Sequence, residues 1–473
     1  MDEADLTDIE RLVWDAFPTG RWINLRPGQE VRAEVLRALL LGARPAVDGE
    51  QAALRLGGAV ITGRLVLSHA DIGGSISLRN CHFTDAPDIY GARMRRLRLV
   101  DCELPGLNLA VTEISAGIRL SGTIFTGQLS LAGARIGGAI VLDGSKVSGA
   151  GRAFDGTQLT ASRNILAREG FECHGELCLD GAEVVGSLRL TGAVLDNPGG
   201  WALNGAGLRV GAVLDLSGGT TVTGSMRLSN VVVGSLLTLS RLTLTEPGHR
   251  AVDLRSLEAP ELMLQTAVPI PGRVDLGYAR IGLLRDSPET WPHSLTLGGF
   301  TYDVIAGAAP VEERLRWLRR DPSQFRPQVY GRLAAIYMNG GRDDDARAVR
   351  LAGERRRRES LPRTRRLWGW LQDVTVGYGY RPRRAAAWLL GLLVLGWVVF
   401  GVVPPRAAEA PKAPEFHALA YAADLLLPVV DLGQQPAYLP RGWTAWIGYL
   451  LIGAGLLFAT TAAAGVARRL RRD

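Results

Sequence analysis

The chain is poor in lysine, cysteine and aromatic residues. Lys146 and Lys412 are its only lysines, so arginine supplies 52 of the 54 basic residues. Four cysteines in 473 residues are too few for a disulfide scaffold. The 58 glycines lack the three-residue period of collagen, and a hydrophobic fraction of 47% excludes a disordered chain. We therefore expect a protein with a buried core.

The sequence also lacks the motifs of the common enzyme classes. It has no nucleophile motif, phosphate-binding loop or paired metal-ligand spacing. Four residues separate Cys173 from Cys178, which fits neither a redox pair nor a zinc site. The glycines at 205, 207 and 211 imitate a dinucleotide-binding fingerprint only loosely. We predict that the protein is not an enzyme, with no catalytic residues, no cofactor and no metal.

From about residue 54 the sequence repeats in units of 11 residues, with longer inserts between some units. Residues 54–61, 65–72 and 76–83 each combine an L-x-L segment with a segment of the type A-x-I. This alternation predicts two short strands with one apolar face, which a single unit cannot bury alone. We predict a mainly β fold, a β-solenoid of 11-residue half-coils over residues 51–305, with about eleven coils.

The repeat also suggests roles for two of its cysteines and for five of its aspartates. Cys81 and Cys102 take the place of alanine in the core. Five aspartates fall at outward positions beside buried aliphatic residues, and we expect them to be solvated, although two on adjacent coils could form a carboxylate pair. They are Asp143, Asp180, Asp215, Asp253 and Asp275.

Helical segments flank the repeats. Apolar residues at helical spacing over 5–17 and 28–42 predict two helices in a cap over residues 1–50, which would cover the open end of the solenoid. Residues 306–384 form a predicted helical connector with a basic juxtamembrane segment, since residues 311–384 carry 19 arginines against nine acidic residues. We expect several of these arginines to contact anionic lipid headgroups, with a solvated face as the alternative and nucleic acid not expected. They are Arg355, Arg356, Arg357, Arg358, Arg381, Arg383 and Arg384.

Two uncharged stretches follow, over 385–403 and 443–467. Each is long enough to cross a bilayer, so residues 385–473 are predicted to hold two transmembrane helices. The arginines at 381–384 and 468–472 place both outer ends in the cytoplasm. The sequence thus predicts a multi-pass protein of the plasma membrane, with the N-terminal solenoid and the C-terminus cytoplasmic.

The segment between these stretches is ambiguous. Residues 416–435 could form a re-entrant segment or an amphipathic helix on the outer surface. In the first case Asp424, Asp431 and Gln434 would line the mouth of a pore. The sequence TVGYG at 375–379 spells a potassium-channel filter, but it precedes the first predicted span, so we do not expect it to act as one.

Several segments resemble a large group of actinobacterial two-span membrane proteins with pentapeptide-like repeats, often labelled "membrane-associated oxidoreductase". Besides the repeats, the resemblance is carried by the residues at 291–302, 314–318, 377–382 and 427–434. It implies a repeat fold with two C-terminal spans, and it carries no catalytic residue that could be transferred. The 11-residue unit departs from clean pentapeptides.

Three functions remain after the sequence is considered. The first is a membrane-anchored, non-enzymatic scaffold or interaction surface, whose partners would be the lipid bilayer and another protein or further copies of the chain. The second is an oligomeric two-span channel with the solenoid as a cytoplasmic sensor. The third and weakest is a redox enzyme.

Overall fold

The computed structural model describes residues 5–247, 250–307, 309–322, 325–359, 382–408, 413–427 and 431–470. The chain divides into two compact units, residues 1–332 and 333–473. The first unit contains the β-structure and the second is mainly helical.

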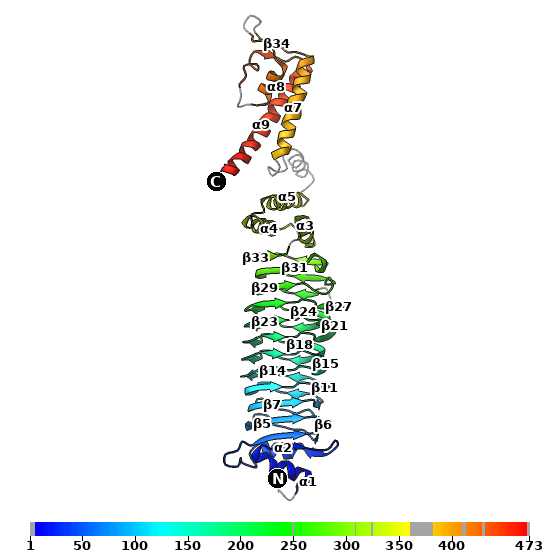
Figure 1. Cartoon of the computed structure of the whole chain (residues 1–473). Helices are drawn as coiled ribbons and strands as arrows, with labels where there is room; N and C mark the ends of the chain where they lie inside the picture. Colours follow the sequence, from blue (N-terminus) through cyan, green and yellow to red (C-terminus); the bar gives the residue numbers. More distant parts are fainter. Residues whose placement is uncertain are drawn as a thin grey trace. The chain divides into compact units, whose positions relative to one another are not determined.

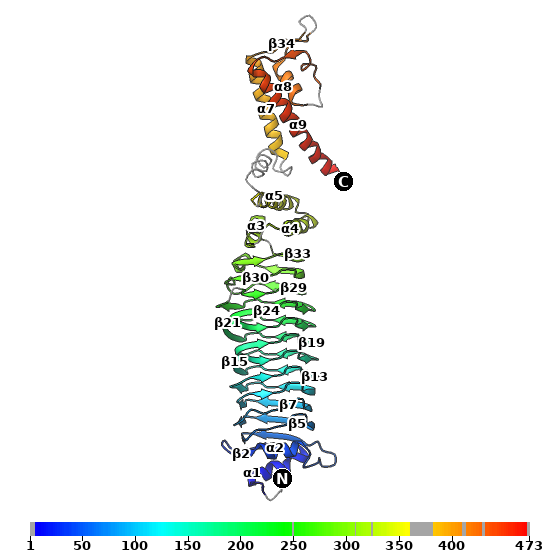
Figure 2. The ribbon, with the colours of Figure 1, turned by 180° about the vertical axis from the view of Figure 1, so that it is seen from behind.

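The first unit is a β-solenoid of about 11 turns, here called coils (Figures 1 and 2). Its strands pair in parallel, and residues about 22 apart in the sequence are neighbours: Leu54 is in register with Ile76, and Ile76 with Leu97. Two of the predicted 11-residue units therefore make one coil. The prediction of a mainly β solenoid is confirmed.

The strands lie in two sheets. The first sheet has 18 strands: β1 (Ile23–Asn24), β3 (Ala53–Gly57), β5 (Asp71–Arg79), β7 (Arg93–Val100), β10 (Glu113–Arg119), β13 (Arg135–Ile136), β14 (Ile140–Val141), β16 (Thr160–Ala161), β17 (Ile165–Leu166), β19 (Glu183–Val184), β20 (Leu188–Arg189), β22 (Arg209–Val210), β23 (Val213–Asp215), β25 (Val232–Val233), β26 (Leu236–Thr238), β29 (Glu258–Leu264), β31 (Arg280–Asp286) and β33 (Thr301–Ala306).

The second sheet has 15 strands: β2 (Glu30–Arg32), β4 (Val60–Thr62), β6 (His82–Phe83), β8 (Glu103–Leu104), β9 (Leu107–Asn108), β11 (Ile124–Phe125), β12 (Leu129–Ser130), β15 (Lys146–Asp155), β18 (Glu172–Cys178), β21 (Val194–Asn204), β24 (Thr221–Arg227), β27 (Thr243–Thr245), β28 (Val252–Asp253), β30 (Arg273–Asp275) and β32 (Ser294–Thr296).

The core of the solenoid is built from columns of identical or similar side chains. Leu56, Leu78 and Leu99 are in register on successive coils, and all three are buried. Full burial of a leucine stabilises a fold by roughly 1.5–3 kcal/mol relative to exposure. Cys81 and Cys102 are buried at the small-residue position, as predicted. The repeat therefore supplies one continuous core.

Most coils turn two corners through residues in the left-handed region, such as Val111 and Gly122, and one of these two corners recurs in eleven coils. The backbone N–H of this corner residue donates to the following coil, as from His69 to the Tyr90 oxygen (2.8 Å) and from Val111 to the Ala132 oxygen (2.8 Å). Glycine suits this conformation and occupies five of the eleven corners, whereas the β-branched Val111 is strained at φ 59°. The corner residues are His69, Gly91, Val111, Gly133, Gln158, Gly181, Gly207, Asn230, Ser256, Tyr278 and Gly299.

The N-terminal end of the stack is covered by α1 (Asp8–Ala16), a short 3-10 turn η2 (Phe17–Thr19) and α2 (Ala33–Leu40). Glu10 joins α1 to the chain before α2, because its carboxylate accepts from the Arg32 backbone N–H (3.1 Å) and from the Arg32 guanidinium (2.7 and 2.8 Å). The guanidinium lowers the pKa of Glu10 to about 2. The predicted helix over 28–42 starts only at residue 33, since residues 30–32 pair with β4 as a strand.

The C-terminal end of the solenoid is covered by η3 (Pro288–Thr290) and α3 (Val311–Leu318), which docks through a buried ion pair. Arg314 donates two bonds to the Asp286 carboxylate (2.6 and 2.9 Å), which also accepts from the Trp291 indole N–H (2.9 Å). The Arg314 guanidinium lies over the rings of Trp291 and Trp317. Both ends of the sheets are thus shielded from edge pairing.

The second unit contains most of α4 (Pro327–Asn339), with α5 (Asp343–Glu359), α7 (Pro382–Val402), α8 (Ala418–Leu426) and α9 (Trp443–Leu470). A small antiparallel pair, β34 (Arg406–Ala407) and β35 (Tyr438–Leu439), lies beside them in the sequence. The buried apolar cluster of the second unit includes Phe400, Tyr421, Tyr438 and Leu451.

The structure corrects the prediction of two transmembrane helices. Over the described residues, no helix combines the length and the hydropathy that crossing a membrane requires. The two uncharged stretches do form helices, α7 and α9. The segment 375–379 lies outside the described residues.

The strained corner at Val111 gives a test of the repeat. We expect Val111→Gly to stabilise the solenoid by about 1 kcal/mol, because glycine removes the left-handed penalty of a β-branched residue at an exposed position. Val304→Gly is the matched control, since Val304 is equally exposed but lies in strand β33, where glycine should destabilise. Urea unfolding followed by circular dichroism measures both. A loss of stability in Val111→Gly would contradict the assignment of the corner.

Candidate anion-binding groove

Charged residues on the outer face of the first sheet mostly alternate in sign from coil to coil. In one column Asp71, Arg93, Glu113 and Arg135 are in register on successive coils. Glu113 pairs with both arginines, at 3.2 Å from Arg93 and 3.8 Å from Arg135. The same alternation brings Arg280 to Glu258 at 3.2 Å further along the column. Stacking of opposite charges in register therefore neutralises most of the charge on this face.

A neighbouring column breaks this alternation. Arg98 of β7 is in register with Arg119 of β10, and Arg96 lies two residues before Arg98 on the same strand. Arg55 of β3 is in register with Ser77, which is in register with Arg98. Like charges directly opposite each other in a sheet are destabilising. Repulsion between Arg98 and Arg119 is therefore expected to lower the stability of the solenoid.

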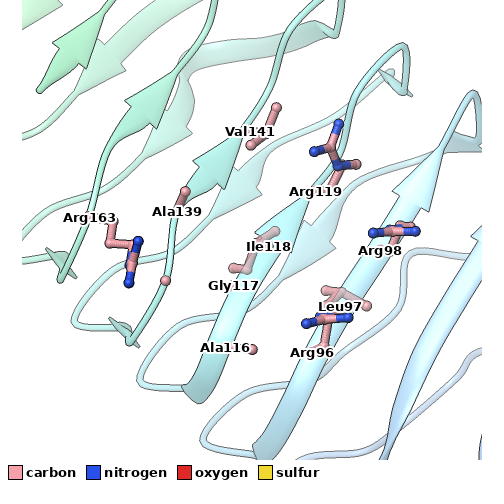
Figure 3. A pocket seen from close by; sticks show the side chains of 11 residues that line it. Arg96, Leu97, Arg98, Ala116, Gly117, Ile118, Arg119, Ala139, Val141 and Arg163 are labelled. Atoms are coloured by element: carbon pink, nitrogen blue, oxygen red, sulfur yellow. The ribbon is translucent and has the colours of Figure 1, made fainter. Parts of the chain in front are cut away.

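These arginines border a shallow groove of about 320 Å³ (Figure 3). Arg96, Arg98 and Arg119 lie on one side of it, and Arg163 lies across it, after β16. Its floor is formed by small residues at a bend of the coil, namely Ala116, Gly117, Gly138 and Ala139. We call this site the arginine groove.

The floor is bare because the backbones of successive coils approach closely there. A Cβ atom on Gly138 would lie 1.5 Å from the carbonyl oxygen of Ala116, which no side chain tolerates. A Cβ atom on Gly117 would lie 2.8 Å from the Ala139 oxygen. The glycines are thus required by the bend, and they leave the groove open between its arginines.

The electrostatics of the arginine groove are uncompensated. Burial lowers the pKa of the Arg98 guanidinium, and the neighbouring Arg119 and Arg96 lower it further. The Arg98 Nε atom is buried without a hydrogen-bond partner. Within the described parts of the chain, Arg96, Arg98, Arg119 and Arg163 form no ion pair; Arg119 helps to lower the pKa of Asp143, but that carboxylate is bonded to Arg168. An anion is the ligand that such a cluster favours.

The residues predicted to line a pore mouth lie in the second unit and bond to its backbone. Asp424 is 4% exposed and accepts from the backbone N–H groups of Leu432 (2.8 Å), Gln434 (2.9 Å) and Gln435 (2.7 Å). The Gln434 side chain is also buried, and it donates to the Glu415 oxygen (3.0 Å). Only Asp431 is exposed. Asp424 and Gln434 thus order the turn that follows α8.

The arginines predicted to contact lipid headgroups are described only in part. Arg356 pairs with Glu359 (2.7 Å) and Arg357 with Glu354 (3.9 Å), all within α5, and Arg355 lies on the same helix. Arg381 and the side chains of Arg358, Arg383 and Arg384 lie outside the described residues.

The outward aspartates include one pair on adjacent coils. Asp253 and Asp275 are in register and both are buried, so they are not solvated as expected. Burial raises the pKa of Asp253, but the Arg255 guanidinium, bonded to it at 2.7 and 2.9 Å, outweighs burial and lowers the pKa below its usual value. A carboxylate held charged in this way cannot serve as a general acid. Among the described residues, no group of three potential ligands could hold a metal ion.

Sequence reasoning missed the arginine groove. The signal was present, because Arg98 and Arg119 are 21 residues apart, which is close to one coil. Arg163 could not be assigned in this way, since the inserts between later repeats change the spacing.

Comparison of the chain with known protein families, with curated proteins and with solved structures found no match. The role of the arginine groove is therefore argued from its own geometry.

The uncompensated charge in the arginine groove makes a prediction about stability. We expect Arg98→Gln to stabilise the solenoid by about 0.5 kcal/mol at low salt, because it removes a like-charge contact with Arg119. The gain should shrink at high salt, where the repulsion is screened. Arg93→Gln is the control and should destabilise slightly, since Arg93 has an acidic partner. Thermal unfolding at two salt concentrations measures both, and equal responses of the two variants would refute the prediction.

Proposed function

We propose that the chain is a non-enzymatic binding protein whose solenoid holds an anionic partner in the arginine groove. One observation carries this proposal: Arg98 and Arg119 stack in register and form no ion pair with any described residue, on a face where most other charges alternate. An electrostatic cost that the fold retains at an open groove is best explained by a ligand that removes it.

The lining of the groove favours binding over catalysis. Its described lining residues are arginine, glycine and aliphatic residues, and include no serine, cysteine, histidine or carboxylate. Chemistry at this site would therefore lack a nucleophile and a general base. The position of the arginines on paired strands is suited to recognition, because groups on rigid elements are held more accurately than groups on loops.

Binding of an acidic peptide tests this function. We expect a fluorescein-labelled oligo-glutamate peptide to bind the full chain, and the affinity to fall as salt screens the arginines. The double variant Arg98→Gln with Arg119→Gln should weaken binding about tenfold, which corresponds to about 1.4 kcal/mol. Fluorescence anisotropy measures the dissociation constant.

Arg189→Gln is the matched control for this experiment. Arg189 is exposed and lies in the same outward column as Arg119, two coils beyond Val141, but outside the groove. Its substitution should leave the affinity unchanged. If the peptide does not bind, or if both variants weaken it equally, the arginine groove is not the binding site.

A separate observation in the second unit supports a second proposal, association with a lipid surface. The described faces of α7 and α9 expose large apolar side chains, which on a globular unit mark an interaction site. Tryptophan and tyrosine among them are the residues preferred at the boundary between lipid and water. The exposed apolar residues of these helices include Leu390, Trp397, Val402, Trp443, Trp446 and Tyr449. The channel hypothesis requires two spanning helices and is not retained.

Flotation with phosphatidylcholine vesicles tests lipid association. We expect the full chain to float, and the double variant Trp397→Ser with Trp446→Ser to float at most half as well, because it removes two exposed indoles. Tyr278→Ser is the control, since Tyr278 is 70% exposed but lies on the solenoid. Flotation that does not depend on the two tryptophans would contradict the proposal.

A further inference from the structure

We infer that the arginine groove selects a phosphate monoester, a dianionic group, over carboxylates and phosphodiesters. This inference rests on the proposed function, since it names the chemistry of the anionic partner. It comes from the number, spacing and isolation of the arginines along one side of the groove.

Three of the four arginines, Arg96, Arg98 and Arg119, lie along one side of the groove. Arg96 and Arg98 leave the same face of β7, because the residue between them, Leu97, is buried. Their Cα atoms are about 7 Å apart along the strand, and Arg119 is about 4.8 Å from Arg98 across the strands. A phosphate monoester presents three terminal oxygens, so each oxygen can accept from a different arginine. A carboxylate has only two.

The balance of charge favours the same ligand. Arg96, Arg98 and Arg119 bring three positive charges together, and within the described chain none of them forms an ion pair, since Asp143, the carboxylate whose pKa Arg119 helps to lower, is bonded to Arg168. A phosphate monoester carries about two negative charges above its second pKa near 6, whereas a carboxylate or a phosphodiester carries one. The dianion therefore neutralises most of the cluster, and a monoanion leaves it strongly positive.

The rest of the groove has room for the organic group that is esterified to the phosphate. The small floor residues Gly117 and Ala139 lie between the three arginines and Arg163. Arg163 follows β16 and lies three residues before Leu166, the residue in register with Arg119 two coils, or roughly 10 Å, further along the stack. An ester group can lie on this bare floor, with Arg163 as a second contact for a further anionic group.

Calorimetric titration of the full chain with two small probes tests this selectivity. Methyl phosphate is a dianion at pH 7.5, and dimethyl phosphate is a monoanion of similar shape. We expect methyl phosphate to bind at least tenfold more tightly at pH 7.5. At pH 5.0 its second proton is bound, so its affinity should fall to that of dimethyl phosphate.

The variants locate the effect in the arginine groove. Arg119→Gln should weaken binding of methyl phosphate at least tenfold, and Arg189→Gln should leave it unchanged. Thermal unfolding of each unliganded variant shows that the fold is intact. If Arg119→Gln fails to fold, Arg96→Gln replaces it and should show the same loss.

Three further probes identify the source of the phosphate: inorganic phosphate, a phosphoserine peptide, and vesicles that contain phosphatidic acid. The tightest binder among them indicates a free metabolite, a modified protein or a lipid headgroup, and each result supports the inference. Acetate or dimethyl phosphate binding as tightly as methyl phosphate at pH 7.5 would overturn it. Binding of oligo-glutamate would then still support the proposed function, whereas loss of both ligands would remove both proposals.

Discussion

Parallel pairing in register is the constraint on which the rest of the solenoid depends. Each residue lies about 4.8 Å from its equivalents on the coils before and after it. Side chains at equivalent positions of successive coils are therefore neighbours, as Leu56, Leu78 and Leu99 are in the core. Columns of like residues are favourable inside and costly outside when they are charged. The arginine groove is the place where this cost is retained.

The constraint also explains how much of the fold could be predicted. The 11-residue period specifies alternating faces and hence stacked half-coils, so the solenoid could be predicted from residues such as Leu54, Ile76 and Leu97. The period says nothing about the segments outside it. Residues 30–32 were assigned to a helix because Val31 fits a helical apolar pattern, whereas its backbone bonds to β4 and continues the sheet. Tertiary pairing outweighed the local pattern there.

The candidate site was less predictable for a related reason. Hydropathy indicates which face a residue occupies, but only the register shows which charges become neighbours. Arg98 is in register with Arg119, whereas Arg93 is in register with Glu113. Arg93 and Arg98 lie on the same strand, β7, and the sequence around them does not distinguish these two situations. In the second unit the two uncharged stretches do form helices, α7 and α9, but over the described residues neither meets the length and hydropathy of a membrane span. Asp424 could likewise be read as pore-lining, although its carboxylate accepts three backbone N–H groups.

The left-handed corners have a consequence for how such a chain can change in length. The left-handed corners of a coil close that layer by itself, with bonds only to adjacent layers. Gain or loss of a whole coil leaves every other layer intact, whereas loss of a single residue from a strand would turn its buried side chains outward. The solenoid is therefore divisible in units of one layer. Adding or removing whole coils would therefore change the distance between the arginine groove and either capped end and leave the structure of the groove unchanged.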